Sequence, residues 1–549
     1  MASTGHHRGL IAYATLIAIF VAWANAIDIF LEWNVALDNT IQPVSQDQSV
    51  ITINGKFPGP LINATTNDFV HVNVFNNMDE PVLFTLNGIQ QRLKSWQDGV
   101  SGTTCPIKPA QTGLTFFYFP SINFHKAAGG FGPIRVNNRD VIAVPFPKPE
   151  AEFDLLIGDW FYDNYKLTAF QAIPDITLMN GKGPYRHPFS KAHESFNVIK
   201  GKTYRFRISN VGTTLSFNFG IQNHKMLLVE TEGSYTNQII LESLDVHAGQ
   251  SYSVLVTADQ NDADYYNVAT PKLLNNTLHE SLVGVGVLHH SNSNTEPSGP
   301  LPSGPDPFDL DFSLNQAKSI RWNLTTGAAR PNPQGTFNIS NVTLSQNFVL
   351  QSSEAEISGA PRCVINNVSY YTVETPLKLA DHFLNGSTVY RLDKFPVRSV
   401  NANAAYGISV VTGIHKGWIE IVFKNTLGVM DSWHFDGYGF HVVGFGIGES
   451  KSDLRSTYNL FDPVVRSTVQ VYLGGWTAVY AYLDNLGMWN LRSQLLKHWY
   501  LGQELYVRVH DADPNPAKEQ PPPENLFKCD PSDPSAPAGA PSPAPWTGP

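Results

Sequence analysis

The sequence predicts an all-β protein, because short stretches of alternating residues recur along the whole chain. Residues 70–74 alternate valine with polar side chains, and residues 252–256 place Tyr, Val and Val on one face. Residues 419–423 repeat the pattern with Ile, Ile and Phe. A period of two residues is typical of strands that bury one face.

Length and composition describe a large globular protein. With 549 residues, a prior of ~150 residues per domain gives three to four domains. Apolar residues make up 42% of the chain and aromatic residues 12%, which is ample for packed cores. The formal net charge is -10 and there is no basic run, so the sequence argues against nucleic acid as a partner.

The first 26 residues have the pattern of a secretory signal peptide. Arg8 precedes an apolar run from Leu10 to Trp23, and Ala24-Asn25-Ala26 resembles a cleavage site. A retained signal anchor is the alternative. No other stretch is apolar enough over enough residues to span a bilayer, so we expect a secreted, extracellular protein without a transmembrane segment.

Composition and strand patterns also predict the order of the domains. Ser, Pro, Asn and Gly are concentrated in residues 291–307, which predicts a linker, and the end of the chain is rich in Pro, Ala and Ser. The expected units are a signal peptide (1–26), three domains (27–145, 146–290 and 308–512) with the linker (291–307) before the third, and a disordered tail (513–549).

The stretch Asp484–Gln503 lies between two segments with strand alternation, 476–481 and 505–509. We expect it to form a loop with one short irregular or helical turn. A loop in this position can face the end of a β-sandwich, where functional sites are often built.

This stretch resembles the last copper motif of the multicopper oxidases. Asp484, Asn485, Gly487 and Trp489 match the start of that motif. Where the family continues with His-Cys-His, this chain has Arg-Ser-Gln at 492–494. His498 is in register with the last histidine of the motif, and Gln503 is in register with the axial position.

Other segments resemble the same family. LFTLNGIQQ (83–91) corresponds to its His-x-His-Gly motif, FFYFPSINFHKAAGGFG to its Tyr-His-x-His segment, and DSWHFDGYGFHVVGFG (431–446) to its His-Pro-x-His-x-His-Gly motif. RWNLTTGAARPNPQGTF and YTVETPLKLADHF match a narrower plant subgroup, the pollen-specific and skewed-growth-like homologues of ascorbate oxidase. The resemblance implies three consecutive cupredoxin-like Greek-key β-barrel domains.

The resemblance also implies that most copper ligands are replaced. The residues at the ligand positions are Thr85, Asn87, Phe119, Ser121, Asp431, His434, Asp436, Arg492, Ser493, Gln494 and His498. Of these eleven positions only two keep histidine. Because a blue-copper centre needs a thiolate, we expect no bound metal, no cofactor and no catalytic residue. Copper remains the alternative that the family assignment implies.

Arg492 would place a permanent positive charge where the family binds copper. We therefore expect its guanidinium to pair with Asp436 or Asp431, which would replace the charge of the metal by an internal ion pair.

In plant ascorbate oxidases a cysteine of the first domain is joined to one near the C-terminus. Cys105 and Cys529 match those two places, so the resemblance implies this disulfide and leaves Cys363 without a partner. The segment between Cys105 and Phe116 is about a strand shorter than in the family, from a real shortening or from an error in the gene model.

Asn-x-Ser/Thr sequons predict glycosylation at Asn63, Asn275, Asn323, Asn338, Asn341, Asn367 and Asn385.

Three functions follow from these observations. The first is a non-catalytic plant glycoprotein of the cell wall or apoplast, acting in wall expansion or pollen-tube growth, with wall components or apoplastic proteins as partners. The second is a residual copper-dependent oxidoreductase. The third is a wall-polysaccharide-binding protein that uses exposed aromatic side chains such as Trp96 or Tyr438. Neither a substrate nor an oligomeric state follows from the sequence.

Overall fold

The structure is a computed structural model. It describes residues 27–44, 49–109, 112–114, 118–138, 144–168, 173–274, 280–324, 338–386, 389–449, 454–510 and 519–529. The expected signal peptide, the sequon at Asn275 and the chain beyond 529 lie outside these ranges.

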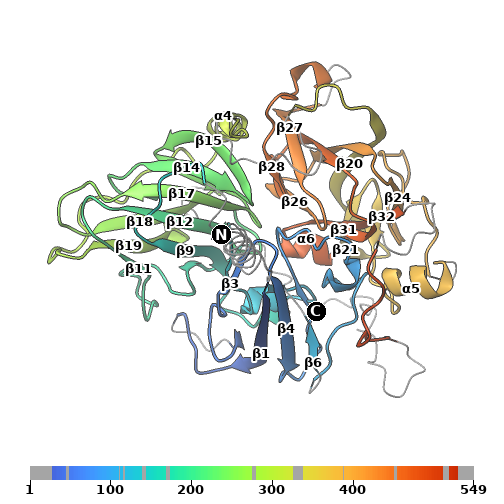
Figure 1. Ribbon diagram of the computed structural model, residues 1–549, viewed down its shortest axis with the longest axis horizontal. Coiled ribbons are helices and arrows are strands. Elements are labelled where there is room, and N and C mark those ends of the chain that lie inside the picture. The colour runs from blue at the N-terminus through green and yellow to red at the C-terminus, as the bar shows by residue number, and fades with distance from the viewer. Residues whose placement is uncertain are drawn as a thin grey trace, which may run out of the picture.

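The all-β prediction is confirmed, since strands form most of the regular structure (Figure 1). The first unit holds a four-stranded sheet, two strand pairs and two short 3-10 helices. The sheet has the order β2 (Val50–Ile53), β1 (Asp28–Asp38), β4 (Phe69–Asn76) and β6 (Thr112–Leu114). The pairs are β3 (Ile62–Thr65) with β8 (Ile134–Asn137) and β5 (Phe84–Thr85) with β7 (Phe119–Pro120), and the helices are η1 (Ser95–Gln97) and η2 (His125–Ala128).

The second unit consists of two sheets and a short helix, α2 (Tyr165–Thr168). The six-stranded sheet has the order β10 (Ile176–Met179), β9 (Glu152–Trp160), β12 (Thr203–Asn210), β17 (Ser251–Thr257), β14 (Met226–Thr231) and β15 (Ser234–Leu241). The five-stranded sheet has the order β11 (Ser195–Val198), β19 (Gly284–His290), β18 (Tyr265–Pro271), β13 (Phe217–Ile221) and β16 (Ser243–Val246).

The third unit is larger and again has two sheets. The eight-stranded sheet has the order β23 (Ala405–Gly407), β22 (Val368–Tyr370), β21 (Ala360–Ile365), β20 (Leu344–Ile357), β25 (Trp418–Asn425), β30 (Gly475–Tyr482), β27 (Phe440–Ile447) and β28 (Val465–Arg466). The five-stranded sheet has the order β24 (Val410–Ile414), β32 (Glu504–His510), β31 (Gly487–Ser493), β26 (Asp431–Phe435) and β29 (Thr468–Val471). The helices are α4 (Leu310–Ser319), α5 (Leu377–Leu384), η3 (Leu454–Thr457) and α6 (Leu496–Tyr500).

Apolar side chains on the facing sides of these sheets form the cores, as strand alternation requires. One large cluster joins the second and third units. Another fills the first unit and includes side chains of the third, among them Met488 from β31 and Trp499 from α6. In Figure 1 the orange β31 and α6 lie beside the blue first unit. The third unit therefore contacts the first through the stretch that resembles a copper motif.

The described part of the expected tail, residues 519–529, packs against the rest of the protein. Glu519 accepts a hydrogen bond from the Lys378 ammonium at 2.6 Å, and the Trp96 indole donates to the carbonyl of Gln520 at 3.1 Å. Cys529 forms a disulfide with Cys105, with their Cα atoms 5.9 Å apart. The expectation of a disordered tail from residue 513 is thus corrected for this segment, which its contacts and the covalent bond hold in place.

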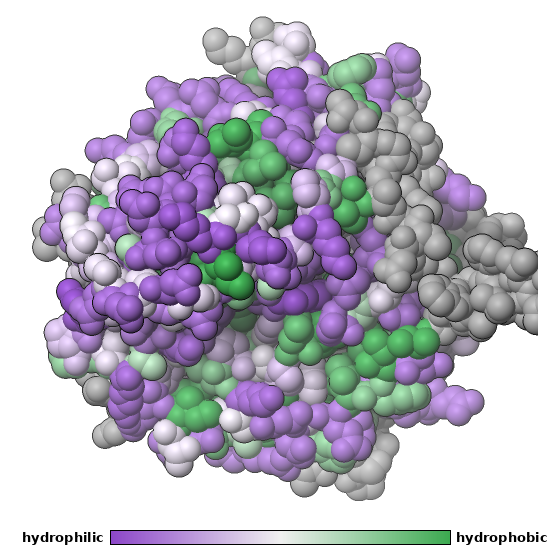
Figure 2. Space-filling view, turned by 60° about the vertical axis from the view of Figure 1, so that its left-hand side comes forward, coloured by the Kyte–Doolittle hydropathy of each residue, from purple (hydrophilic) through white to green (hydrophobic). Residues whose placement is uncertain are grey.

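The molecular surface is mostly polar on the face shown in Figure 2, where hydrophobic residues form small groups separated by polar ones. Within the described ranges, we find no helix with the length and apolar character needed to cross a membrane.

Candidate functional site

The stretch predicted as a loop contains a buried strand, β31, followed by the short helix α6. The expected short helical turn is present as α6, between the strands β30 and β32, but the expected loop is wrong over residues 487–493 for a physical reason. All seven residues of β31 are buried, because its sheet is covered by the first unit on one side and by its own core on the other. Asn490 and Arg492 therefore face a polar interior. In the sequence, these two polar residues suggest an exposed segment, because a strand buried on both faces usually has few polar side chains.

Arg492 forms an ion pair with Asp436 at the centre of this interior. Both side chains are almost completely enclosed, at 0% and 2% exposure. The same guanidinium donates to the amide oxygen of Asn490 at 3.0 Å and lies 4.6 Å from the ring of Trp499. The structure thus selects Asp436 from the two expected partners, and β31 positions Arg492 directly opposite His434 of β26.

His434 completes this group, which we call the Arg492 cluster: Arg492, Asp436 and His434. Its Nε2 lies 2.9 Å from the Asp436 carboxylate and its Nδ1 lies 2.9 Å from the Thr468 hydroxyl. Burial lowers the pKa of His434. Burial alone would raise the pKa of Asp436, but Arg492 and His434 hold it below its usual range. The cluster therefore carries an ionised carboxylate between a cation and a neutral imidazole.

Two further ionisable side chains lie near the Arg492 cluster. Burial and the Asp436 carboxylate raise the pKa of Asp98 well above its usual value. Lys126 lies 4.4 Å from the ring of Phe119, and burial lowers its pKa to about 8. Burial therefore disfavours the charged form of both Asp98 and Lys126 in this interior.

Four other residues at the ligand positions of the family's copper motifs make ordinary hydrogen bonds. Thr85 donates to the carbonyl of Asp98 at 2.9 Å, and Ser121 donates to the carbonyl of Gly99 at 2.6 Å. Asn87 accepts from Gln494 at 2.7 Å and donates to Gly249 at 2.6 Å, which joins the three units. These side chains hold the domains together and present no set of convergent metal ligands.

A trinuclear copper cluster does not fit the residues around Arg492. Its guanidinium cannot lose its proton near neutral pH and would face the metal ions with a fixed positive charge. The single imidazole there, His434, has both ring nitrogens engaged by Asp436 and Thr468. Binding three copper ions would require breaking each of these contacts.

The second group of positions surrounds Ser493. Its hydroxyl donates to Asp431 at 2.6 Å, and Asp431 also accepts from the backbone N–H of Ser432 at 2.8 Å. Burial raises the pKa of Asp431 although Ser493 and the nearby His498 oppose the change. A serine hydroxyl is a hard, weak ligand, so this position does not fit a blue-copper centre.

Some polar atoms near Ser493 have no partner. Nδ1 of His498 lies 4.0 Å from Asp431, and among the described residues it makes no hydrogen bond. Both amide atoms of Gln503, at the axial position, are likewise buried without a partner in the described chain. Burial lowers the pKa of His498, so its imidazole is neutral at pH 7 and offers a free lone pair.

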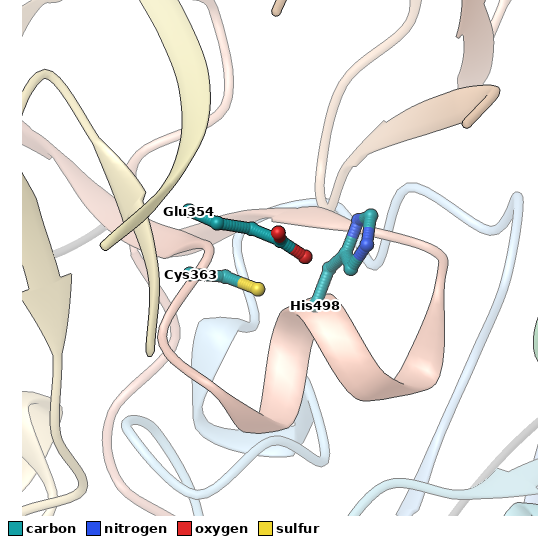
Figure 3. Close-up of side chains that lie close together, drawn as sticks. All are labelled: Glu354, Cys363 and His498. Atoms are coloured by element: carbon teal, nitrogen blue, oxygen red, sulfur yellow. The ribbon is translucent and has the colours of Figure 1, made fainter. Parts of the chain in front are cut away.

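The structure also brings together three residues that sequence reasoning did not connect: Glu354, Cys363 and His498 (Figure 3). One ligand atom from each lies within 4.8 Å of the other two. Burial raises the pKa of the Cys363 thiol to about 12. No local motif signals this grouping, because it depends on the pairing of β20 with β21 and on the packing of α6.

The expected sugar-stacking residues are not exposed. Trp96 and Tyr438 are each 2% exposed, because Trp96 packs under the Lys378 ammonium and Tyr438 donates to the carbonyl of Asn485. The interpretation of these two rings as a carbohydrate-binding surface is therefore corrected.

The described sequons differ in exposure. Asn63, Asn338, Asn341 and Asn385 are exposed. Asn367 is half-buried, and its amide donates to the carbonyls of Val400 and Ala402. Asn323 is 4% exposed, so its amide leaves no room for a glycan and this sequon is removed from the expected set.

Comparison with known proteins identifies the family. Three sequence profiles described as Multicopper oxidase match residues 36–141, 152–293 and 374–515. The chain is 46% identical over 518 residues to the Monocopper oxidase-like protein SKU5 of Arabidopsis thaliana, covering 89% of this chain and 87% of the relative. It is 41% identical over 515 residues to an L-ascorbate oxidase homolog of Brassica napus, covering 89% and 90%.

Solved structures share the fold at low sequence identity. A laccase from Botrytis aclada superimposes with a TM-score of 0.72 at 22% identity, covering 88% of each chain. Fet3p, a multicopper oxidase that functions in iron import, gives a TM-score of 0.72 at 18% identity, covering 88% of this chain and 90% of its own. The prediction of three cupredoxin-like domains is confirmed, and the chain belongs to the multicopper oxidase family.

Proposed function

We propose that this protein is a non-oxidase member of the multicopper oxidase family, which acts as a secreted glycoprotein of the plant cell wall and apoplast in wall expansion or pollen-tube growth. The observation that carries the loss of oxidase activity is the buried Arg492–Asp436 ion pair at positions that the family uses for copper. An internal cation there takes the electrostatic role of the metal without its redox chemistry.

The loss of oxidase activity also rests on the route that electrons take. In this family electrons from a reducing substrate enter through a copper–thiolate centre and then reduce oxygen at the trinuclear cluster. Ser493 stands at the thiolate position, and its hydroxyl donates a hydrogen bond to Asp431. Without a thiolate ligand there is no one-electron acceptor at the entry point.

Several features support secretion. Residues 1–26 have the pattern of a signal peptide. The Cys105–Cys529 disulfide is typical of proteins that fold in an oxidising compartment. Four sequons lie on exposed loops or strands, where a glycan would meet no obstacle. The role in wall expansion or pollen-tube growth rests on the resemblance to the plant subgroup.

A second candidate is a residual copper oxidoreductase. Two observations favour it: relatives carry the name Monocopper oxidase-like, and His498 keeps an unpartnered nitrogen. A single copper ion at His498 lacks the partner ions that four-electron oxygen reduction uses in this family. This candidate therefore predicts at most a slow, single-copper activity.

Oxygen uptake separates the two candidates. The secreted, copper-dialysed protein is mixed with ascorbate in an oxygen electrode, with the L-ascorbate oxidase of Cucurbita maxima, a 28% identical relative, as the positive control. We expect uptake no faster than that of free copper at the same concentration. Uptake that exceeds this background and is lost in His498→Gln would overturn the proposal in favour of the oxidoreductase.

Localisation is tested separately. A fluorescent protein fused after residue 529 is expressed in plant cells that are then plasmolysed. We expect fluorescence in the wall and the space outside the retracted membrane, and its retention inside the cell when residues 1–26 are deleted. Fluorescence in the cytosol of the full-length fusion would contradict a role in the wall.

A further inference from the structure

We propose that Glu354, Cys363 and His498 form a binding site for a divalent cation of borderline softness, such as zinc. We call these three residues the 354/363/498 site. Two of them lie on β20 and β21 of the third domain and the third lies on α6, so the site joins the eight-stranded sheet to the helix after β31.

The sheet positions two of the ligands side by side. Glu354 and Cys363 are direct partners in the antiparallel pairing of β20 with β21. Side chains of directly opposed residues lie on the same face of a sheet, with their Cβ atoms ~4.5–5.5 Å apart. The pairing of β20 with β21 therefore places the carboxylate and the thiol on the same face of the sheet, and their proximity does not depend on a loop.

The helix places the third ligand over the same face. The backbone N–H of Cys363 donates to the carbonyl of Leu501 at 3.1 Å, and the Ser369 hydroxyl donates to the same carbonyl at 2.9 Å. These bonds fix the end of α6 against β21 and β22. In Figure 3 the His498 ring rises from the helix toward Glu354, and the Cys363 sulfur points into the space between them.

Two of the three side chains are buried, and the third is exposed to solvent, from which an ion could enter. Cys363 is 1% exposed and His498 is 6% exposed, while Glu354 is exposed. Nδ1 of His498 is buried and has no hydrogen-bond partner in the described protein. A buried polar atom without a partner is unfavourable, and a cation that enters past Glu354 would satisfy the imidazole.

The ligand set selects the type of ion. Thiolate, imidazole and carboxylate are the three side-chain ligands of zinc, with bonds of roughly 2.0–2.3 Å. The Cys363 thiol is protonated in the metal-free protein, so formation of the zinc–sulfur bond breaks the S–H bond and releases its proton to solvent. Tetrahedral geometry would place ligand atoms roughly 3.5 Å apart, so rotations of Glu354 and His498 need to bring atoms now within 4.8 Å closer by about 1 Å. Three protein ligands leave the fourth position for water. Magnesium and calcium are disfavoured because they prefer oxygen ligands.

The test titrates zinc into chelator-treated secreted protein by calorimetry, with cobalt as a spectroscopic probe. Cys105 and Cys529 are joined and Cys363 is the remaining cysteine of the sequence, so a thiolate-to-cobalt absorption band reports on this residue alone. We expect one zinc ion per chain and a cobalt–thiolate band, both lost in Cys363→Ser and in His498→Gln.

Two variants keep the test decisive. Glu354→Gln changes an exposed side chain, leaves the core intact and should weaken zinc binding by at least the roughly 10- to 100-fold that loss of an outer partner costs a metal site. His71→Gln is the matched control, because His71 is an exposed histidine paired with Asp28 and should leave binding unchanged. Absence of zinc binding, zinc binding unaltered by all three site variants, or cobalt bound without a thiolate band would each overturn the proposal.

Discussion

The two groups of positions that correspond to the family's copper motifs differ in how their polar side chains are paired. In the Arg492 cluster, the guanidinium pairs with Asp436, and His434 uses both of its nitrogens. Around Ser493, by contrast, His498 and the amide of Gln503 lack hydrogen-bond partners within the described chain. The first group has become a self-sufficient polar core, whereas the second keeps unused ligand atoms.

The difference has a physical origin in charge. Beside Arg492, the permanent positive charge of the guanidinium helps to hold the Asp436 carboxylate ionised. Around Ser493, burial raises the pKa of Asp431, and its hydrogen-bond donors include the Ser493 hydroxyl and the Ser432 backbone N–H. These neutral donors leave Nδ1 of His498 without a hydrogen-bond partner in the described chain.

Replacing Arg492 tests the description of the Arg492 cluster and should change the free energy of unfolding more than the other substitutions. Arg492→Leu leaves the buried Asp436 carboxylate unpaired, and breaking one half of a buried pair costs about 3–5 kcal/mol. Guanidinium denaturation of the variant measures this loss. The double variant Arg492→Leu/Asp436→Asn should recover most of it, and an unchanged unfolding midpoint for Arg492→Leu would sink the ion-pair interpretation.

The lowered pKa of Lys126, which is buried near the Arg492 cluster, predicts a specific pH dependence of stability. Its pKa of about 8 in the folded state lies below the usual lysine pKa of 10.5, so the unfolded state binds the proton more strongly between these pH values. Stability should therefore rise as pH increases from 8 to 10.5, by up to about 3 kcal/mol, and fall again as pH is lowered. Lys126→Met should lack this component of the pH dependence, which urea denaturation at a series of pH values would measure. Identical pH profiles for both proteins would refute the assignment.

Ser493→Ala sharpens the comparison at the second group. The variant removes the hydroxyl that donates to Asp431, and a net loss of about 1–2 kcal/mol is expected for this hydrogen bond. Thermal unfolding, with Ser190→Ala at a serine outside both groups as the control, measures the loss. A loss as large as that of Arg492→Leu would mean that the two groups do not differ in the way described.

Much of the fold could be predicted from the sequence. The alternating stretches 70–74, 252–256 and 419–423 fall in β4, β17 and β25, because each presents one apolar face to a core. β31 was missed because both of its faces are buried, so its residues do not alternate between apolar and polar. Arg492 also suggested an exposed position, since its pairing with Asp436 at the domain junction is not visible in the sequence.

The candidate site was predicted unevenly for a similar reason. The positions around Arg492 and Ser493 follow from motif spacing, which is local. The approach of Cys363 to His498 depends on strand register and helix packing between segments distant in the sequence, and no spacing rule reports it. A structural role for Trp96 was the alternative to sugar binding, but the sequence did not indicate that residues 519–529 supply one of its partners, the carbonyl of Gln520.

Copper content with a visible spectrum tests the central claim most directly. Secreted protein and its Cys363→Ser variant are stripped with chelator, dialysed against copper and analysed by elemental mass spectrometry. The Arg492–Asp436 ion pair predicts no blue band and copper well below one ion per chain in the variant, where the Cys363 thiolate is absent. A blue band in the variant, or three or more copper ions per chain in either protein, would show that this interior still binds the metal and would contradict the account.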